Sequence, residues 1–296
     1  MRGKSSLDRI LAKDQLQALQ AMHKAWGVEL FLASMMWILT KEEQTNGQDK
    51  TRIIPFQLNK VQQDIEKNLA LWNLLLKPRQ AGGTTYFLLR RLLLNAVLDG
   101  GIGCLLISQS SEYAQEHFQI LRRAYNLIGS ANPGGAEEEN TLCISLKQNV
   151  LHTAYSNRRE LVFDYLDSKI RIASAEVEES AQGLTIHHVV ASEYARWPGR
   201  PEETLSNVMG SMVPGGTLDR ESTANGAAGP FYEACLRAMN DPKTSDSRLH
   251  YFGWYWDDGY ANELTKKEQA ELEADLKADE IRVIKKMHME LSSVAA

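Results

Sequence analysis

Residues 71–87 read LWNLLLKPRQAGGTTYF, and this stretch decides the fold class. Its apolar start predicts a buried strand over 71–77, the glycine pair at 82 and 83 predicts a tight turn, and the apolar run over 84–97 predicts a helix. Short apolar strands separated by helices indicate an α/β fold with a mostly parallel sheet covered on both faces. The same alternation predicts further strands over 104–108, 186–191, 216–221 and 248–256, and helices over 111–128, from about 202 and from about 230.

Both ends of the chain depart from this alternation. Helical periodicity over 14–39 precedes a polar loop at 41–50, and a Lys/Glu/Ala-rich helix is expected over 263–291. We therefore expect three parts: a helical N-terminal appendage over 1–50, the α/β core over 51–245, and an aromatic strand with a helical lid or linker over 246–296.

An internal segment also differs from the parallel pattern. Two alternating runs over 159–175, joined at 166–168, predict an antiparallel hairpin that interrupts the parallel order. The polar stretch at 130–139 predicts a surface loop.

Composition supports a folded domain and excludes several classes of protein. The chain has 296 residues, of which 43% are hydrophobic and 24% charged, enough for a buried core. Its three cysteines include no CxxC pair, which argues against a disulfide framework or a zinc site and fits a reducing cytoplasm. A net charge of −5 is not that of a protein that coats nucleic acid, so any contact with DNA must be local.

Neither a membrane span nor a secretion signal is expected. The most apolar stretch, 26–39, contains Glu29 and is shorter than the ~20 residues that cross a bilayer, so a buried or interface helix is the better interpretation. The first fifteen residues lack an apolar signal core.

The loop after the first core strand is a degenerate phosphate-binding loop. On the frame G-x-x-x-x-G-K-[ST], Lys77 takes the first position, Gly82 the glycine, Gly83 the lysine position and Thr84 the magnesium-binding hydroxyl. The order of strand, loop and helix start suits an anion, because helix N-termini attract negative charge. Lys77 or Arg79 could replace the missing lysine. The competing interpretation is an ordinary glycine turn.

An acidic residue at the end of a later strand could complete such a site. The run IHHVVASEYA at 186–195 ends its strand in Ser192 and Glu193. Usually an aspartate here holds magnesium and the next glutamate activates water. Glu193 fits the glutamate role, whereas Ser192 offers only a hydrogen bond to magnesium-bound water. His187 and His188 are expected to be strand residues rather than metal ligands.

A third polar segment, Ser222-Thr-Ala-Asn-Gly226, follows the strand near 216–221. Its hydroxyls and amide can bond a phosphate oxygen in one state and water in another. By itself, such a segment is more typical of an ordinary turn.

Taken in order, these segments resemble the ATPase domain of tailed-phage terminase large subunits. The resemblance rests on LKPRQAGGTT at 76–85, PFQLNKVQ at 55–62, GLTIH at 183–187, S-E-x-A-x-W at 192–197 and STANG at 222–226. GPFYE at 229–233 and the aromatic run at 248–260 also match, so the likeness covers about 25–285. It implies a P-loop NTPase fold of the ASCE type that binds ATP and Mg²⁺.

The resemblance also implies roles for individual residues. Lys77 or Arg79 and Glu193 would be catalytic, and Gln62 would contact adenine, with the adjacent Gln63 left open. Magnesium would be held by Thr84 and, through water, by Ser192. The remaining nucleotide-binding positions would be Gln80, Ala81, Gly82, Gly83, Thr84, Thr85 and Ser192, and Ser222, Thr223, Ala224, Asn225 and Gly226 would couple hydrolysis to movement.

The implied function is translocation of double-stranded phage DNA into a procapsid, in the host cytoplasm at the portal. Portal protein, small terminase subunit and a homo-oligomeric ring are implied as partners, with a monomer in isolation left open. A neighbour could supply an arginine, for which the candidates are Arg122, Arg123, Arg158, Arg159 and Arg171. The C-terminal nuclease of the family has no counterpart, so we expect no nuclease activity. Alternatives are a helicase-like translocase and a non-hydrolysing nucleotide-binding assembly protein.

Overall fold

A single eight-stranded sheet forms the centre of the fold. The computed structural model describes residues 6–41, 51–130, 141–157, 159–177, 185–256 and 264–287. The sheet order is β10-β3-β9-β8-β4-β7-β6-β5. These strands span Arg248–Tyr251 (β10), Trp72–Leu76 (β3), Met212–Ser222 (β9), Ile186–Ser192 (β8), Gly103–Ser108 (β4), Ser168–Ser174 (β7), Glu160–Phe163 (β6) and Thr153–Ser156 (β5).

The strand pairing confirms the predicted α/β class. All pairs from β10 to β7 are parallel, whereas β6 pairs antiparallel with β7 and with β5, so the predicted hairpin is present. One further strand, β9, lies between β3, which leads into the phosphate-binding loop, and β8, which ends in Ser192. A strand inserted at this place is the hallmark of the ASCE type.

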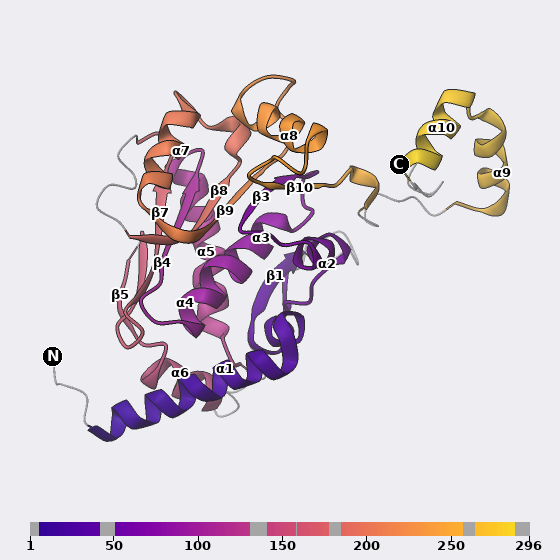
Figure 1. Cartoon of the computed structure of the whole chain (residues 1–296). Coiled ribbons are helices and arrows are strands. Elements are labelled where there is room, and N and C mark those ends of the chain that lie inside the picture. The colour runs from indigo at the N-terminus through magenta and orange to yellow at the C-terminus, as the bar shows by residue number, and fades with distance from the viewer. Residues whose placement is uncertain are drawn as a thin grey trace.

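Helices cover both faces of the sheet (Figure 1). Adjacent residues on one strand, such as Leu74 and Leu75, are both buried because they enter different apolar clusters on opposite faces. One face packs against α3 (Gly83–Phe87), the π-helical turn η1 (Leu88–Leu93), α4 (Leu94–Leu98) and α5 (Ser111–Leu127), and the other against α7 (Pro201–Gly210) and α8 (Pro230–Asn240).

The N-terminal segment differs from the expected helix over 14–39. Helix α1 (Ser6–Met35) kinks at Gly27 and ends at Met35, and the next residues form β1 (Trp37–Lys41), paired antiparallel with β2 (Thr51–Pro55). The apolar run was wrongly extended because its last residues, WIL at 37–39, are strand formers whose partner strand lies beyond the polar loop. The Trp37 indole fixes the strand by donating to the Ser130 carbonyl at 2.9 Å.

Helix α1 also packs on the core. Gln15 donates to the hydroxyl of Ser145 in α6 (Thr141–Asn149) at 2.6 Å, and Gln20 donates to the Leu98 carbonyl at 2.7 Å. Its apolar residues Phe31 and Leu32 belong to the same buried cluster as the core helices. The proposed division at residue 51 therefore separates segments that share one core.

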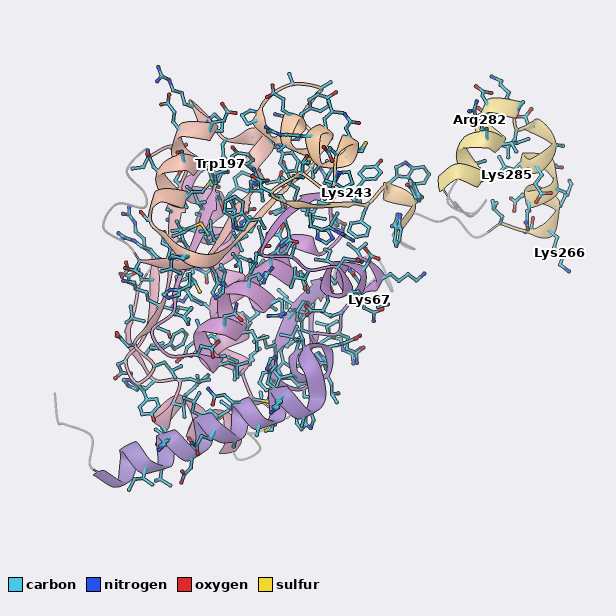
Figure 2. All side chains as sticks on the ribbon, viewed as in Figure 1. Lys67, Trp197, Lys243, Lys266, Arg282 and Lys285 are labelled. Atoms are coloured by element: carbon cyan, nitrogen blue, oxygen red, sulfur yellow. The ribbon has the colours of Figure 1, made fainter. Side chains whose placement is uncertain are left out.

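The strand and helices of the C-terminal part are shorter than predicted. Strand β10 stops at Tyr251, and Trp254–Trp256 form a 3₁₀ turn, η4, so the expected strand over 248–256 was too long. The single helix expected over 263–291 is two, α9 (Lys266–Asp275) and α10 (Ala278–Met287), because the backbone at Leu276 is extended. Figure 1 shows both apart from the sheet, and Figure 2 shows Lys266, Arg282 and Lys285 on them.

Two remaining expectations concern the loop and the membrane. Most of the loop expected at 130–139 lies outside the described residues. Within the residues that the structure does describe, no helix is both long and apolar enough to cross a bilayer.

Candidate nucleotide-binding site

Three segments predicted from sequence meet at the carboxyl ends of β3, β8 and β9. In the sheet register, Leu76 of β3 lies opposite Ser222, and Ser192 of β8 lies opposite Glu221. The loop after β3, Glu193 after β8 and the segment after β9 therefore leave the sheet side by side. Such an edge is where open α/β sheets bind their ligands.

The loop at 77–82 turns sharply into a helix start. Gln80 and Gly82 have φ of +62° and +75°, in the left-handed region. A Cβ on Gly83 would lie 2.4 Å from Leu75 Cδ2 and 3.2 Å from Lys77 Cδ, so glycine at this position allows both side chains to pack closely against the loop. No side chain caps the start of α3 among the described residues, and the helix continues through η1 to Leu98. Its free N–H groups suit an anion.

Lys77 is the cation of the site. Its side chain is 7% exposed, and Nζ lies 3.0 Å from Glu221 Oε2 and 3.4 Å from Glu193 Oε1. Burial by itself would lower the pKa of Lys77, but the two carboxylates outweigh burial and hold the pKa above its usual value. Arg79, the other candidate, is an exposed residue of the loop. The structure thus brings Lys77 to the carboxylates, and its role toward a nucleotide stays a prediction.

Glu221, at the penultimate position of β9, was missed from the sequence. It is fully buried, and its Oε1 accepts hydrogen bonds from Thr84 Oγ1 at 3.0 Å and from Ser192 Oγ at 2.5 Å. Burial would raise its pKa, yet Lys77 and the Ser192 hydrogen bond hold the pKa below its usual value. The signal available in the sequence was the run of charged residues in TLDRES at 217–222, within an expected strand. Because Ser192 donates to Glu221, its predicted water-mediated contact to magnesium stays a prediction.

Glu193 sits in a strained position directly after β8. Its φ is +50°, uncommon for a residue other than glycine and often found at functional sites. Its Oε2 accepts from Thr223 N at 3.4 Å, Thr223 Oγ1 at 3.2 Å and Ser222 Oγ at 3.3 Å. The predicted catalytic glutamate and the predicted coupling segment are therefore in direct contact.

Arg196 adds a second link that the sequence did not reveal. Its guanidinium lies 3.6 Å from Glu193 Oε2 and donates to Thr223, Ala224 and Asn225 at 3.3 Å each. Asn225 Nδ2 in turn donates to the Ala195 carbonyl at 2.8 Å. The strand-end segment and the segment 222–226 thus form one hydrogen-bonded unit.

Trp197 explains the aromatic end of the S-E-x-A-x-W run. This buried residue lies beside α7 (Figure 2), and its indole donates to the Ser192 carbonyl at 2.9 Å. It also stacks edge-on against Tyr194. The tryptophan therefore fixes the backbone that presents Ser192 and Glu193.

Gln62 holds the loop from the other side. It lies in α2 (Lys60–Lys67) and is buried; its Nε2 donates to the Gly82 carbonyl at 2.9 Å and its Oε1 accepts from Asn59 N at 2.9 Å. Both ends of its side chain are thus engaged with the protein, and an adenine contact stays a prediction. Gln63, left open from sequence, faces a cavity of about 340 Å³ beside the loop, lined by Leu58, Asn59, Lys60, Val61, Gln63, Ala81 and Trp256.

The two histidines of β8 form hydrogen bonds to the neighbouring strands and to helix α4. His187 Nδ1 accepts from Gly103 N at 3.0 Å, and His188 contacts Thr217 Oγ1 and Asn95 at 2.8 and 3.1 Å. Burial, helped by Arg91, lowers the pKa of His188 to about 4. In the described part of the chain, no group of three or more His, Cys, Asp or Glu could hold a metal by itself.

The residues present fit a magnesium ion that arrives with a nucleotide. Mg²⁺ prefers oxygen ligands, uses one or two carboxylates, and takes its other ligands from phosphates and water. The Thr84 hydroxyl and the Glu221 carboxylate supply adjacent oxygens beside the helix start. Among the candidate arginines of a neighbouring copy, Arg171 pairs with Glu160 at 3.2 Å, and Arg158 lies outside the described residues.

Comparison with known proteins identifies the fold. No protein-family model and no curated protein matches the sequence. The large terminase ATPase domain of Thermus phage P74-26 superposes with a TM-score of 0.50 at 17% identity, over 77% of this chain and 92% of that one. The HK97 bacteriophage large terminase gives a TM-score of 0.55 at 15% identity, over 81% of this chain and 50% of that one. The chain therefore has the fold of large terminase ATPase domains and spans about half of the HK97 protein.

Proposed function

We propose that this chain is an ATP-hydrolysing motor domain that powers translocation of double-stranded phage DNA into a procapsid. The proposal rests on one observation above all: the Lys77 ammonium contacts both Glu193 and Glu221 beside the start of α3. Thr84 donates to Glu221, and Glu193 accepts from Ser222 and Thr223. The terminase ATPase fold supports the same function.

Binding follows from charge and hydrogen bonding at the loop. The N–H groups of residues 80–85 and the Lys77 ammonium would hold the β- and γ-phosphates, and the Thr84 hydroxyl would hold the magnesium ion. Magnesium supplies charge neutralisation on the phosphates when it is bound. The base lies toward Gln63 and Trp256, which line the adjacent cavity.

Hydrolysis needs Glu193 as the base. Glu193 accepts a proton from the water that attacks the γ-phosphorus, the bond to the bridging oxygen breaks, and ADP leaves with inorganic phosphate as the second product. Glu193 now pairs with Lys77 at 3.4 Å. Phosphate oxygens compete for Lys77, so nucleotide binding releases one oxygen of the glutamate for this task.

Coupling follows from the contacts of the same carboxylate. Any shift of Glu193 alters its hydrogen bonds from Ser222 and Thr223, and Arg196 extends the change to Asn225. Segment 222–226 therefore responds to the state of the nucleotide. This is the property that a motor requires of a coupling element.

The motor acts as part of an assembly in this proposal. Several copies encircle DNA at the portal in the host cytoplasm, with portal protein and small terminase subunit as further partners. A net charge of −5 means that only local surfaces contact DNA. An arginine from a neighbouring copy completes the site.

The direct test is ATP turnover with and without double-stranded DNA. We expect Glu193→Gln to bind Mg·ATP but to lose at least about 10²-fold in turnover, because general base catalysis contributes about 10²–10⁴-fold. Glu202→Gln, an exposed change on α7, is the matched control and keeps wild-type turnover.

Two outcomes would overturn parts of the proposal. If the wild type binds nucleotide but hydrolyses none in every assembly condition tested, the chain is a non-hydrolysing assembly protein. Metal-dependent DNA cleavage would overturn the expectation that the chain is not a nuclease.

A further inference from the structure

The acidic group that Ser192 lacks is present one strand away. Ser192 ends β8 where nucleotide hydrolases of this kind place a magnesium-binding aspartate. Its Cα partner on the adjacent strand β9 is Glu221. A carboxylate therefore lies at the same level of the sheet, on the neighbouring strand that separates β8 from β3.

The hydrogen bonds of Glu221 point to the nucleotide site. A single oxygen, Oε1, accepts both from Thr84 Oγ1 at 3.0 Å and from Ser192 Oγ at 2.5 Å. Thr84 is the residue at the magnesium-binding position of the loop. Ser192 thus orients the carboxylate, and Glu221 is the anionic partner of Thr84.

Among the described residues, the cations that face Glu221 and Glu193 are few. Lys77 is buried and faces both Glu221 and Glu193, at 3.0 and 3.4 Å. Arg196 also approaches Glu193, but at 3.6 Å and with 37% of its side chain exposed. Lys77 is thus shared between the two carboxylates, so a cation that arrives with a nucleotide can take its place beside Glu221 when phosphate oxygens draw the ammonium away.

We propose that Glu221 supplies the carboxylate toward which the magnesium of Mg·ATP is held, with Ser192 as its positioning residue. The inference rests on the proposed function and adds to it a residue that replaces the missing aspartate. The ligand class is a magnesium complex of a nucleoside triphosphate. Glu221 acts together with Thr84, and its position is fixed by the β8–β9 pairing.

The test measures binding rather than turnover. A fluorescent, non-hydrolysable ATP analogue is titrated against the full chain in MgCl₂ and in EDTA, and the ratio of the two affinities is the magnesium response. We expect Glu221→Gln to lose about 10–100-fold of this response, the usual effect of losing a metal-supporting group, with the affinity in EDTA retained. Glu233→Gln, an exposed change on α8, keeps the full response.

A second variant moves the carboxylate from β9 to β8. Adding Ser192→Asp to Glu221→Gln returns the carboxylate to β8 and is expected to restore most of the magnesium response. Glu221→Asp, which keeps the charge, gives an intermediate response and serves if the glutamine variant does not fold. Melting curves of all variants check folding.

The outcomes separate the two proposals. An unchanged magnesium response in Glu221→Gln, or equal losses in MgCl₂ and EDTA, overturns the role of Glu221 while the proposed function stands. Absence of analogue binding by the wild type in either buffer overturns the proposed function and this inference with it.

Discussion

Two fully buried carboxylates on β9, Asp219 and Glu221, face the same side of the sheet two residues apart. Asp219 lies deeper, where it accepts from Asn73 Nδ2 at 2.6 Å and pairs with Arg91 Nε at 3.1 Å. Asn73 Oδ1 also contacts His250 Nε2 at 3.0 Å. These four side chains form a closed polar network between β10, β3, β9 and η1.

Glu221 has a different kind of surroundings. Its partners are Lys77 and Thr84 of the loop and Ser192 at the strand end, all beside the free helix start. Burial and ion pairing are common to both carboxylates and do not distinguish them. What distinguishes them is the position of the partner groups: those of Asp219 lie within the sheet and its covering helix, whereas those of Glu221 lie at the loop where we propose that the nucleotide binds.

Substitution of Asp219 is expected to have the largest effect on the free energy of unfolding. Asp219→Ala leaves Arg91 buried without its counter-charge, and we expect a loss of about 3–5 kcal/mol in the free energy of unfolding. Denaturant unfolding measures this loss. The exposed control Asp241→Ala changes stability by no more than about 0.5 kcal/mol. A loss below about 1 kcal/mol in Asp219→Ala would contradict a scaffold role.

The network also predicts a pH effect through His250. Burial, with a smaller contribution from Arg248, lowers the pKa of His250 to about 4, so the unfolded chain takes up its proton near pH 6.5 and the folded chain does not. His250 therefore contributes stability above pH 6.5 that is lost as the pH falls toward 4. Between pH 7 and 4.5 the wild type should lose about 2 kcal/mol more than His250→Asn.

Unfolding curves at the two pH values measure this difference. Asp219 has its pKa raised to about 6, chiefly by burial, so its protonation favours the folded state as the pH falls. Both proteins contain Asp219, and the comparison with His250→Asn removes its contribution. Parallel pH profiles for the two proteins would show that His250 is not held neutral by the fold.

The smallest expected effect on stability lies at the loop. In Gly83→Ala the new Cβ meets Leu75 and the Lys77 stem, whose flexible side chains can yield, so we expect a loss of about 1 kcal/mol together with weaker nucleotide binding. Gly210→Ala, at the end of α7, meets nothing within 4 Å and should be neutral or stabilise by up to about 1 kcal/mol. Equal stability and equal binding in both variants would mean that the loop does not need its close approach to Lys77.

Much of the site could be predicted because its parts are local in sequence. The order of strand, glycine turn and helix identifies the loop, and the Ser192–Glu193 pair ends an apolar strand that periodicity reveals. Glu221 could not be found in this way. Hydropathy marks apolar strands as buried, whereas β9 buries a polar run whose partners, such as Lys77 and Arg91, lie on other elements.

The errors in the fold have the same origin. The end of the apolar run at 37–39 forms β1 because β2 pairs with it, and that pairing depends on a segment beyond the polar loop. Gln62 is a polar residue of the kind usually found on the surface of a helix. It is buried here because the phosphate-binding loop packs over it. Local periodicity contains no information about either contact.

The central claim is that the loop at 77–85 is a nucleotide site with Lys77 as its cation. Equilibrium titration of Mg·ATP against the wild type, Lys77→Ala and Lys67→Ala tests it most directly, because Lys67 is an exposed lysine on α2 (Figure 2). Charge-assisted hydrogen bonds contribute about 1.5–3 kcal/mol, so we predict binding at least about tenfold weaker in Lys77→Ala and unchanged in Lys67→Ala. Equal affinity of the two variants, or no binding by the wild type, would contradict the claim.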